Sequence, residues 1–210
     1  MLSGQWKVVI GSGLVRGIST AIVGMVFAAG TALSAPIAPK GTYVLDSEHT
    51  QIVFSIKHMG LSTFFGRFGK ITGTMIFDQE APEQSTLNVQ IDMHAIDTHV
   101  AALDNSLPNS VFIADKYPFA TFVSAAVKKT GANTGTVTGN LTLAGITKPV
   151  TLDVTFNGGR GTGEPLQPYR IGFDAQAIVK RSDFGLTHMI WSGFVGDEVQ
   201  LLIEAEAVRR

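Results

Sequence analysis

The sequence has no cysteine among its 210 residues. This absence excludes a disulfide framework, a thiolate zinc site, an iron–sulfur cluster and a cysteine nucleophile. Charge is also sparse, because charged residues make up 16% of the chain while hydrophobic residues make up 45%. That balance provides enough apolar material for a sizeable core. The net charge is −1, without the basic runs that mark a nucleic-acid-binding protein, so no nucleic-acid partner is expected.

Residues 1–34 differ in composition from the rest of the chain. Lys7 and Arg16 are their only charges, and an apolar run covers residues 18–30. A positive start, an apolar run and small residues before a cleavage point are typical of a secretory signal peptide, with cleavage expected after Ser34. An uncleaved anchor is the alternative, although the run is shorter than the roughly 20 residues of a membrane span. We expect a periplasmic or secreted protein without a stable membrane span after cleavage.

Apolar and polar residues alternate with a period of two along most of the remaining chain, which predicts half-buried antiparallel strands. In residues 119–129 the pattern puts Phe119, Val123 and Val127 on one face. Residues 99–118 break the alternation and predict a short helix. Eight or nine strands with one helix predict an all-β sandwich or barrel. The predicted strands are 42–46, 50–58, 70–78, 86–92, 119–129, 136–143, 149–157, 169–179 and 197–208.

Four segments, in this order, resemble the YceI-like family of polyisoprenoid-binding proteins. They are YVLDSEHTQIVFSIKHMGLSTFFGRFGKITGTMIFD, NLTLAGITKPVTLDVTFNG, KRSDFGL and GDEVQLLIEAEAV. The resemblance spans residues 42–208 and implies a lipocalin-like antiparallel β-barrel of about eight strands, exported from the cell. It also implies an elongated apolar channel that holds a long isoprenoid lipid, such as a quinone or a polyprenyl phosphate, for sequestration or transport. Neither catalysis nor a cofactor is implied.

The helical segment departs from the family pattern. Family members commonly carry Arg-Asp, one more residue and His-Leu there, whereas this chain has LDNSL at residues 103–107. Asp104 and Leu107 match the pattern, but Leu103 and Ser106 replace the arginine and the histidine. Any contact of that pair with a polar head group would be lost in this chain.

Apolar side chains on the presumed inward faces are candidates to line the channel. The small residues Gly73, Gly139 and Ala177 on the same faces would leave volume for a lipid tail, although the faces could instead fill an ordinary core. Each buried methylene contributes about 0.8 kcal/mol, so roughly ten of them would give micromolar binding before ordering costs. The candidate channel residues are Phe54, Ile56, Ile71, Met75, Leu141, Phe173, Ala175 and Val179.

The tripeptide Asp-Phe-Gly at residues 183–185 matches the magnesium-binding motif of protein kinases. The glycine-rich loop, strand lysine and His-Arg-Asp loop of a kinase are missing, which excludes phosphoryl transfer. Counting by twos from Ile171 makes Arg181 point inward at the end of its strand. A buried arginine needs acceptors, which Asp183 or the phosphate of a ligand could provide.

Two further residues are candidate polar handles for a ligand head group. His58 continues the inward parity of its strand, and Arg67 lies in the short run FGRFG.

The five histidines lack metal-binding spacing, so no metal site is expected. A G-x-S-x-G nucleophile elbow is absent. An enzyme acting on a lipid in the same cavity and a stress-related structural barrel without ligand are the alternative functions, and a homodimer is compatible with the sequence.

Overall fold

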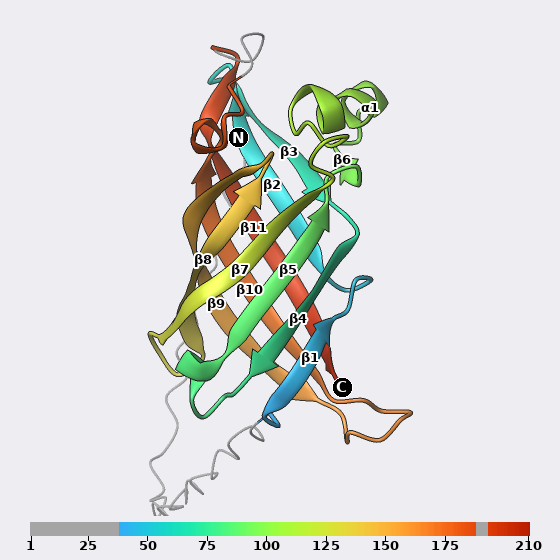
Figure 1. Cartoon of the computed structure of the whole chain (residues 1–210), viewed down its shortest axis with the longest axis vertical. Helices are drawn as coiled ribbons and strands as arrows, with labels where there is room; N and C mark the ends of the chain where they lie inside the picture. Colours follow the sequence, from blue (N-terminus) through green and yellow to red (C-terminus); the bar gives the residue numbers. More distant parts are fainter. Residues whose placement is uncertain (1–37, 188–192) are drawn as a thin grey trace, which may run out of the picture. The chain divides into compact units, whose positions relative to one another are not determined.

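The computed structural model describes residues 38–187 and 193–210, so the predicted signal peptide at residues 1–34 lies outside the described part. Strands dominate this part, together with one α-helix and two short 3₁₀ helices (Figure 1). Within these residues, none of the helices has the length and apolar character needed to cross a membrane. The elements are β1 Gly41–Leu45, β2 Gln51–His58, β3 Ser62–Phe68, β4 Ile71–Phe77, η1 Pro82–Gln84, β5 Thr86–Asp92, β6 Ile96–Asp97, α1 Ala101–Ser110, β7 Phe119–Lys129, β8 Thr134–Leu143, β9 Ile146–Arg160, β10 Arg170–Lys180, η2 Arg181–Phe184 and β11 Val195–Arg209.

The strands form a closed antiparallel barrel. The ring runs β1-β4-β5-β7-β8-β9-β10-β11 and closes through pairing of β11 with β1. β11 also pairs with β2, so β1 and β2 are two successive segments of one side of the barrel. β3 and β4 continue one another in the same way, because β3 pairs with β2 and β4 pairs with β1. The predicted eight-stranded, lipocalin-like barrel is confirmed, and the sandwich is excluded.

Apolar and polar residues alternate along the strands, and the apolar side chains point into the barrel. This agrees with the prediction for most of the strands. On β10, Ile171, Ala175, Ala177 and Val179 are buried at intervals of two or four residues. The prediction for β7 was wrong at its start. Phe119 and Val123 are exposed, whereas Ala120 and Phe122 are buried, because the inward face begins on the even-numbered positions. A β-bulge in the middle of β7 then shifts the register, as bulges do, by one residue.

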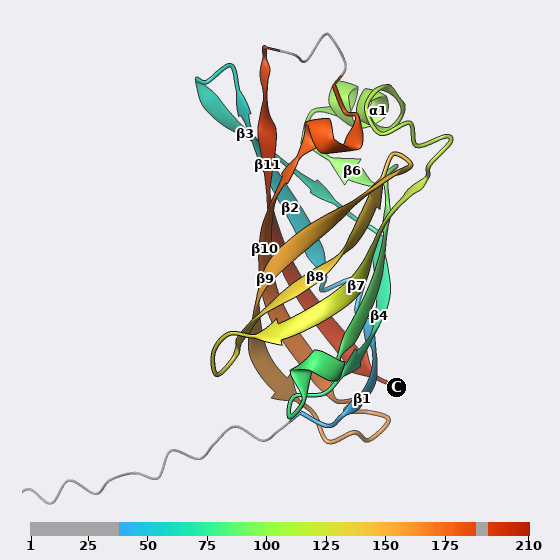
Figure 2. The ribbon, with the colours of Figure 1, turned by 60° about the vertical axis from the view of Figure 1, so that its left-hand side comes forward.

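The helix α1 lies at the end of the barrel that also carries the β2–β3 hairpin and the start of β11 (Figure 2). It occupies part of the segment for which a helix was predicted, and Pro108 is accommodated within it. β6 pairs with only two residues of β3, Arg67 and Phe68. The rest of β3 extends past β6. Leu103 and Leu107 of α1 contribute to the interior at this end of the barrel.

Candidate functional site: an apolar channel inside the barrel

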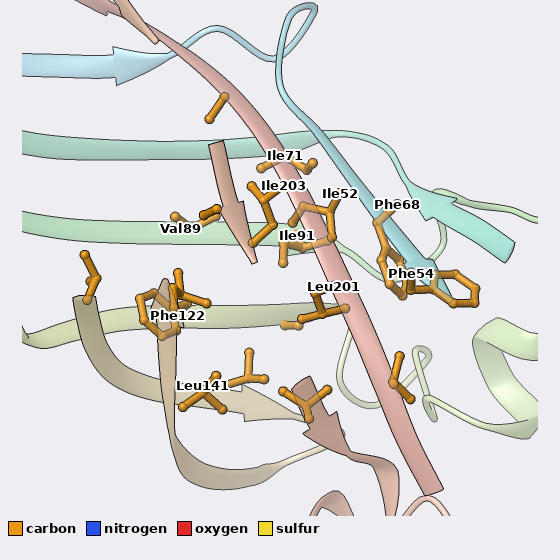
Figure 3. A pocket seen from close by; sticks show the side chains of 18 of the residues that line it. Ile52, Phe54, Phe68, Ile71, Val89, Ile91, Phe122, Leu141, Leu201 and Ile203 are labelled. Carbon is orange, nitrogen blue, oxygen red and sulfur yellow. The ribbon is translucent and has the colours of Figure 1, made fainter. Parts of the chain in front are cut away.

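A cavity of about 1100 Å³ occupies the interior of the barrel. Its wall consists mainly of aliphatic and aromatic side chains from facing strands, which point into a common space in Figure 3. Such side chains are labelled there on β2, β5, β8 and β11, among others. All of the candidate channel residues line this cavity: Phe54, Ile56, Ile71, Met75, Leu141, Phe173, Ala175 and Val179.

Aromatic rings pack against one another in two parts of the cavity wall. The rings of Phe156 and Phe173 are 5.3 Å apart between centroids, and both contact the ring of Phe77. Elsewhere in the wall, Phe68 lies 5.3 Å from Phe54 and 5.8 Å from Phe112. Because Phe112 follows α1, this second group joins the helical segment to the barrel wall.

The inward glycines do not leave open volume as predicted. A Cβ atom at Gly139 would lie 2.5 Å from the ring of Phe122, and one at Gly73 would lie 2.9 Å from the side chain of Leu45. Neighbouring side chains therefore already fill the space that these glycines free. Of the small inward residues, Ala175 lines the cavity, so the channel owes its volume to the width of the barrel more than to the glycines.

The ionisable side chains in the cavity wall are His58, Lys128, Lys129 and Arg181. The described lining residues include no aspartate or glutamate. His58 ends β2, close to the start of β11, whereas the two lysines belong to the β7–β8 hairpin at the end of the barrel away from α1 (Figure 1). Apart from its apolar surface, the channel thus offers groups that suit an anion.

Arg181 lines the cavity, and its guanidinium is held by backbone carbonyls. Its Nε donates a hydrogen bond to the carbonyl of Gly196 at 2.9 Å, and its two terminal nitrogens donate to the carbonyls of Val195 and Leu186. Asp183 is exposed and does not line the cavity, so the proposed hold of Asp183 on Arg181 is replaced by these three carbonyls. The arginine fastens η2 to the start of β11 while its charge remains at the cavity wall.

The other residues of the motif around Arg181 also have structural roles. The backbone N–H and the hydroxyl of Ser182 donate hydrogen bonds to the carboxylate of Asp197, and the hydroxyl bond is the main cause that lowers the pKa of Asp197. Phe184 is fully buried, and Gly185 adopts φ 69°, which favours glycine. The Asp-Phe-Gly sequence is therefore part of a turn that closes one end of the barrel wall.

Arg67 lies outside the cavity wall and faces solvent. Its side chain donates two hydrogen bonds to Asp97 on β6, at 2.9 and 2.7 Å. The backbone N–H of His99 and then the guanidinium of Arg67 lower the pKa of Asp97. The placement of Arg67 as a handle for a ligand was wrong, because its strand turns this side chain to the outer face, where it joins β3 to β6.

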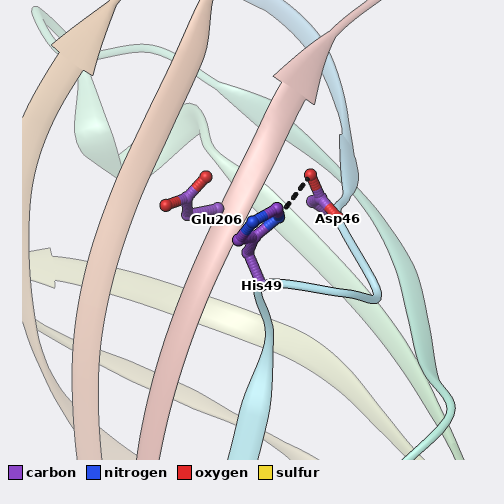
Figure 4. Close-up of side chains that lie close together, drawn as sticks. All are labelled: Asp46, His49 and Glu206. Carbon is purple, nitrogen blue, oxygen red and sulfur yellow. Dashed lines mark ion pairs between the residues drawn. The ribbon is translucent and has the colours of Figure 1, made fainter.

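A second polar cluster, which the sequence did not single out, joins the β1–β2 connection to β11. Asp46, His49 and Glu206 lie close together (Figure 4), and their ligand-type atoms are all within 4.8 Å of one another. Arg170 forms ion pairs with both carboxylates, so a cation of the protein itself already balances the cluster. The arrangement is that of an ion-pair network that fixes the bend between β1 and β2.

Replacing Asp46 by asparagine is expected to flatten the loss of stability in acid. The hydrogen bond from Arg170 is the main cause that lowers the pKa of Asp46 from 3.8 to about 2. A carboxyl group with a lowered folded-state pKa stabilises the protein above the unfolded pKa and loses this effect as the pH falls through the folded one. After solvent screening, the contribution is about 1 kcal/mol.

Thermal unfolding measured from pH 6 down to pH 2 tests this expectation. The parent protein should lose stability more steeply than Asp46→Asn between about pH 4 and pH 2. Glu83→Gln, at an exposed position in η1, is the control and should follow the parent. Parallel profiles for the parent and Asp46→Asn would contradict the role of this network.

Comparison with known proteins agrees with this architecture. The model of the YceI-like domain family matches residues 43–207. A UPF0312 protein of Pectobacterium atrosepticum is 39% identical over 196 residues, which cover 92% of this chain and 96% of that protein. The crystal structure of BcnA from Burkholderia cenocepacia superimposes with a TM-score of 0.70 at 27% identity, covering 77% of this chain and 98% of BcnA.

A domain of Saccharophagus degradans, described as a polyisoprenoid binding domain implicated in plant cell wall breakdown, has the same fold. It superimposes with a TM-score of 0.61 at 15% identity and covers 83% of this chain and 100% of that domain. At this identity the likeness concerns the fold alone. Together with the family match over most of the chain, the closed barrel and its apolar channel lead to one assignment: the chain belongs to the YceI-like domain family.

Proposed function

We propose that this protein is an exported carrier that holds a long isoprenoid lipid, of the quinone or polyprenyl phosphate type, in the barrel channel for sequestration or transport. The observation that carries this proposal is the apolar interior of about 1100 Å³. Pockets for drug-sized ligands have volumes of roughly 300–1,000 Å³, so this channel has room for a larger, elongated molecule.

The apolar wall favours a hydrocarbon guest over water. Water needs polar partners, and an apolar cavity therefore stays dry. Wall atoms that face an empty space lose their dispersion contacts, and a lipid tail would restore them. At about 0.8 kcal/mol for each buried methylene, roughly ten methylenes correspond to micromolar affinity before the chain's ordering is subtracted. Such a channel selects length and width more than chemical detail.

The charges in the wall support a lipid with an anionic head group. His58 and Arg181 lie at the α1 end of the channel, and the described wall carries no carboxylate that would repel a phosphate. Guanidinium groups bind phosphate through charge-assisted hydrogen bonds. The same lack of a carboxylate among the described wall residues supports binding over an enzyme that uses a pair of carboxyl groups as acid and base.

Two further observations support the remaining parts of the proposal. The polyisoprenoid binding domain of Saccharophagus degradans shares the fold, which makes isoprenoids the first class to test. The composition of residues 1–34 supports export, with a periplasmic or secreted location. Cell fractionation followed by N-terminal sequencing would then find the chain outside the cytoplasm and beginning at Ala35.

The ligand itself is tested by purifying the protein without detergent and analysing its lipid extract by mass spectrometry. We expect an isoprenoid at close to one molecule per barrel. Delipidated protein should take up added quinone or prenyl phosphate. The absence of a bound isoprenoid, together with no uptake of either probe, would disprove the carrier function. Turnover of an added lipid would instead establish an enzyme.

A further inference from the structure

Large apolar side chains are exposed at the α1 end of the channel, which we call the channel mouth. Leu61 is 83% exposed, Met59 is 50% exposed, and Phe194 is 51% exposed. Leu61 and Met59 belong to the β2–β3 turn, and Phe194 immediately precedes β11. A hydrogen bond of 2.6 Å from the N–H of Met59 to the carbonyl of Phe194 joins the two segments. These three residues form one surface, which we name the apolar tip.

The apolar tip is continuous with the channel. The residues that flank the turn, His58 and Ser62, both line the cavity, and Val195, next to Phe194, lines it too. Figure 2 shows the β2–β3 hairpin, the start of β11 and α1 at the same end of the barrel. A lipid that enters or leaves at this end therefore passes beside the apolar tip.

The turn places an apolar residue where its backbone disfavours one. Met59 and Gly60 have φ values of 54° and 69°, and the N–H of Leu61 bonds to the carbonyl of His58. Positive φ at both central positions is the geometry of a type I′ β-turn over residues 58–61, for which Asn-Gly is preferred. Met59 instead occupies the first central position, and half of its surface is in water.

The charge of this region suits an anionic, apolar surface. Residues 57–66, which form the β2–β3 turn and its flanks, contain Lys57 and His58 but no acidic residue, and Asp197, the first acidic residue after Phe194, accepts hydrogen bonds from Ser182. Apolar side chains beside a cation such as Lys57 bind at membrane interfaces, because the apolar groups enter the acyl region and anionic head groups attract the cation. A cargo that is insoluble in water also has to be collected from and delivered to such a surface.

We propose that the apolar tip docks the protein onto the surface of a lipid bilayer, so that the channel mouth opens toward the membrane from which the lipid is taken or to which it is given. This docking builds on the proposed carrier function. Transfer by contact lets the isoprenoid pass between two apolar environments. Its tail then avoids the hydration that opposes release into water.

The test measures binding of the full chain to large unilamellar vesicles of phosphatidylethanolamine and phosphatidylglycerol by flotation. The variant Met59→Asn, Leu61→Ser removes two apolar side chains and installs the preferred Asn-Gly turn, so the fold should keep its melting temperature. Burial of one leucine is worth about 1.5–3 kcal/mol, so vesicle partitioning should fall at least about tenfold. Leu166→Ser is the matched control, because Leu166 is 96% exposed in the β9–β10 connection, away from the channel mouth.

Uptake of a short prenyl phosphate added from solution separates docking from cargo binding. We expect this uptake to be equal in the parent, the tip variant and Leu166→Ser, while transfer of quinone between vesicles slows only in the tip variant. Normal uptake without vesicle binding by the parent would overturn docking and leave the carrier function standing. Vesicle binding that depends on the tip, without any prenyl uptake, would support docking and contradict the carrier function. A change from dimer to monomer in the tip variant, with unchanged vesicle binding, would assign the tip to a second copy of the chain and overturn the proposal.

Discussion

Replacing Ala175 by phenylalanine is expected to abolish most of the isoprenoid binding while leaving the barrel folded. Ala175 lies on β10, paired with Val154 and Ile203, and lines the channel. A phenyl ring at this position would occupy space that several methylenes of a lipid tail need. At about 0.8 kcal/mol for each excluded methylene, the loss of three or four corresponds to a reduction in affinity of roughly a hundredfold.

The measurement is the dissociation constant for a fluorescent or quenching prenyl ligand, together with the melting temperature. Ile178→Phe is the matched control, since Ile178 lies on the same strand with its side chain exposed on the outer face. It adds the same type of group outside the channel and should bind as the parent does. Unaltered affinity in Ala175→Phe would show that the ligand does not use this part of the channel and would contradict the proposed site.

Replacing Arg181 by alanine is expected to lower the melting temperature by about 5–10 °C. The change removes three hydrogen bonds that join η2 and Leu186 to the residues at the start of β11. For a part-buried charged donor of this kind, we expect a loss of about 2–3 kcal/mol, and in a domain of this size each kcal/mol shifts the melting temperature by roughly 2–4 °C. Arg181→Lys keeps the charge but lacks the planar fork of donors, so it should recover only a small part of the stability.

Ligand affinity distinguishes two roles of Arg181. If it acts both as a clamp and as a head-group contact, Arg181→Ala should weaken a prenyl phosphate more than a neutral prenol, in addition to lowering stability. Equal loss for the two ligands would limit its role to the clamp. A selective loss for the phosphate at an unchanged melting temperature would contradict the structural role that its three carbonyl partners indicate.

The barrel could be predicted from the sequence because, in a strand with alternating apolar and polar residues, the apolar positions show which side faces the core. The rule failed where the pattern is locally broken. On β7 a bulge shifts the inward face, and Phe119 was therefore assigned to the wrong side. β3 was not predicted, because Phe64 and Phe65 are adjacent and Gly66 follows, so neither alternation nor a turn signal is clear. Only the pairing of β3 with β2 shows which of its side chains face inward.

The candidate site was also predicted only in part. Counting alternate positions along the strands identified the apolar channel residues, whereas the positions of the polar residues depend on contacts between distant segments. Arg67 was misplaced because its strand was missing from the prediction. Asp183 was one of two predicted partners of Arg181, beside a ligand phosphate, but the neutral carbonyls of Leu186, Val195 and Gly196 take its place. Backbone acceptors leave no signal in the sequence.

The double pairing of β11 has a consequence for the timing of folding. This last strand contacts β10, β2 and β1, and its final residues pair with the opening of the domain, as Tyr43 does with Arg209. The ring therefore cannot close until β11 has been synthesised and can reach β1. Contacts between such distant segments form slowly. The proposed export would benefit from this delay, because a chain that crosses a membrane has to stay unfolded until then, and β11, which closes the barrel, follows in the sequence every strand with which it pairs.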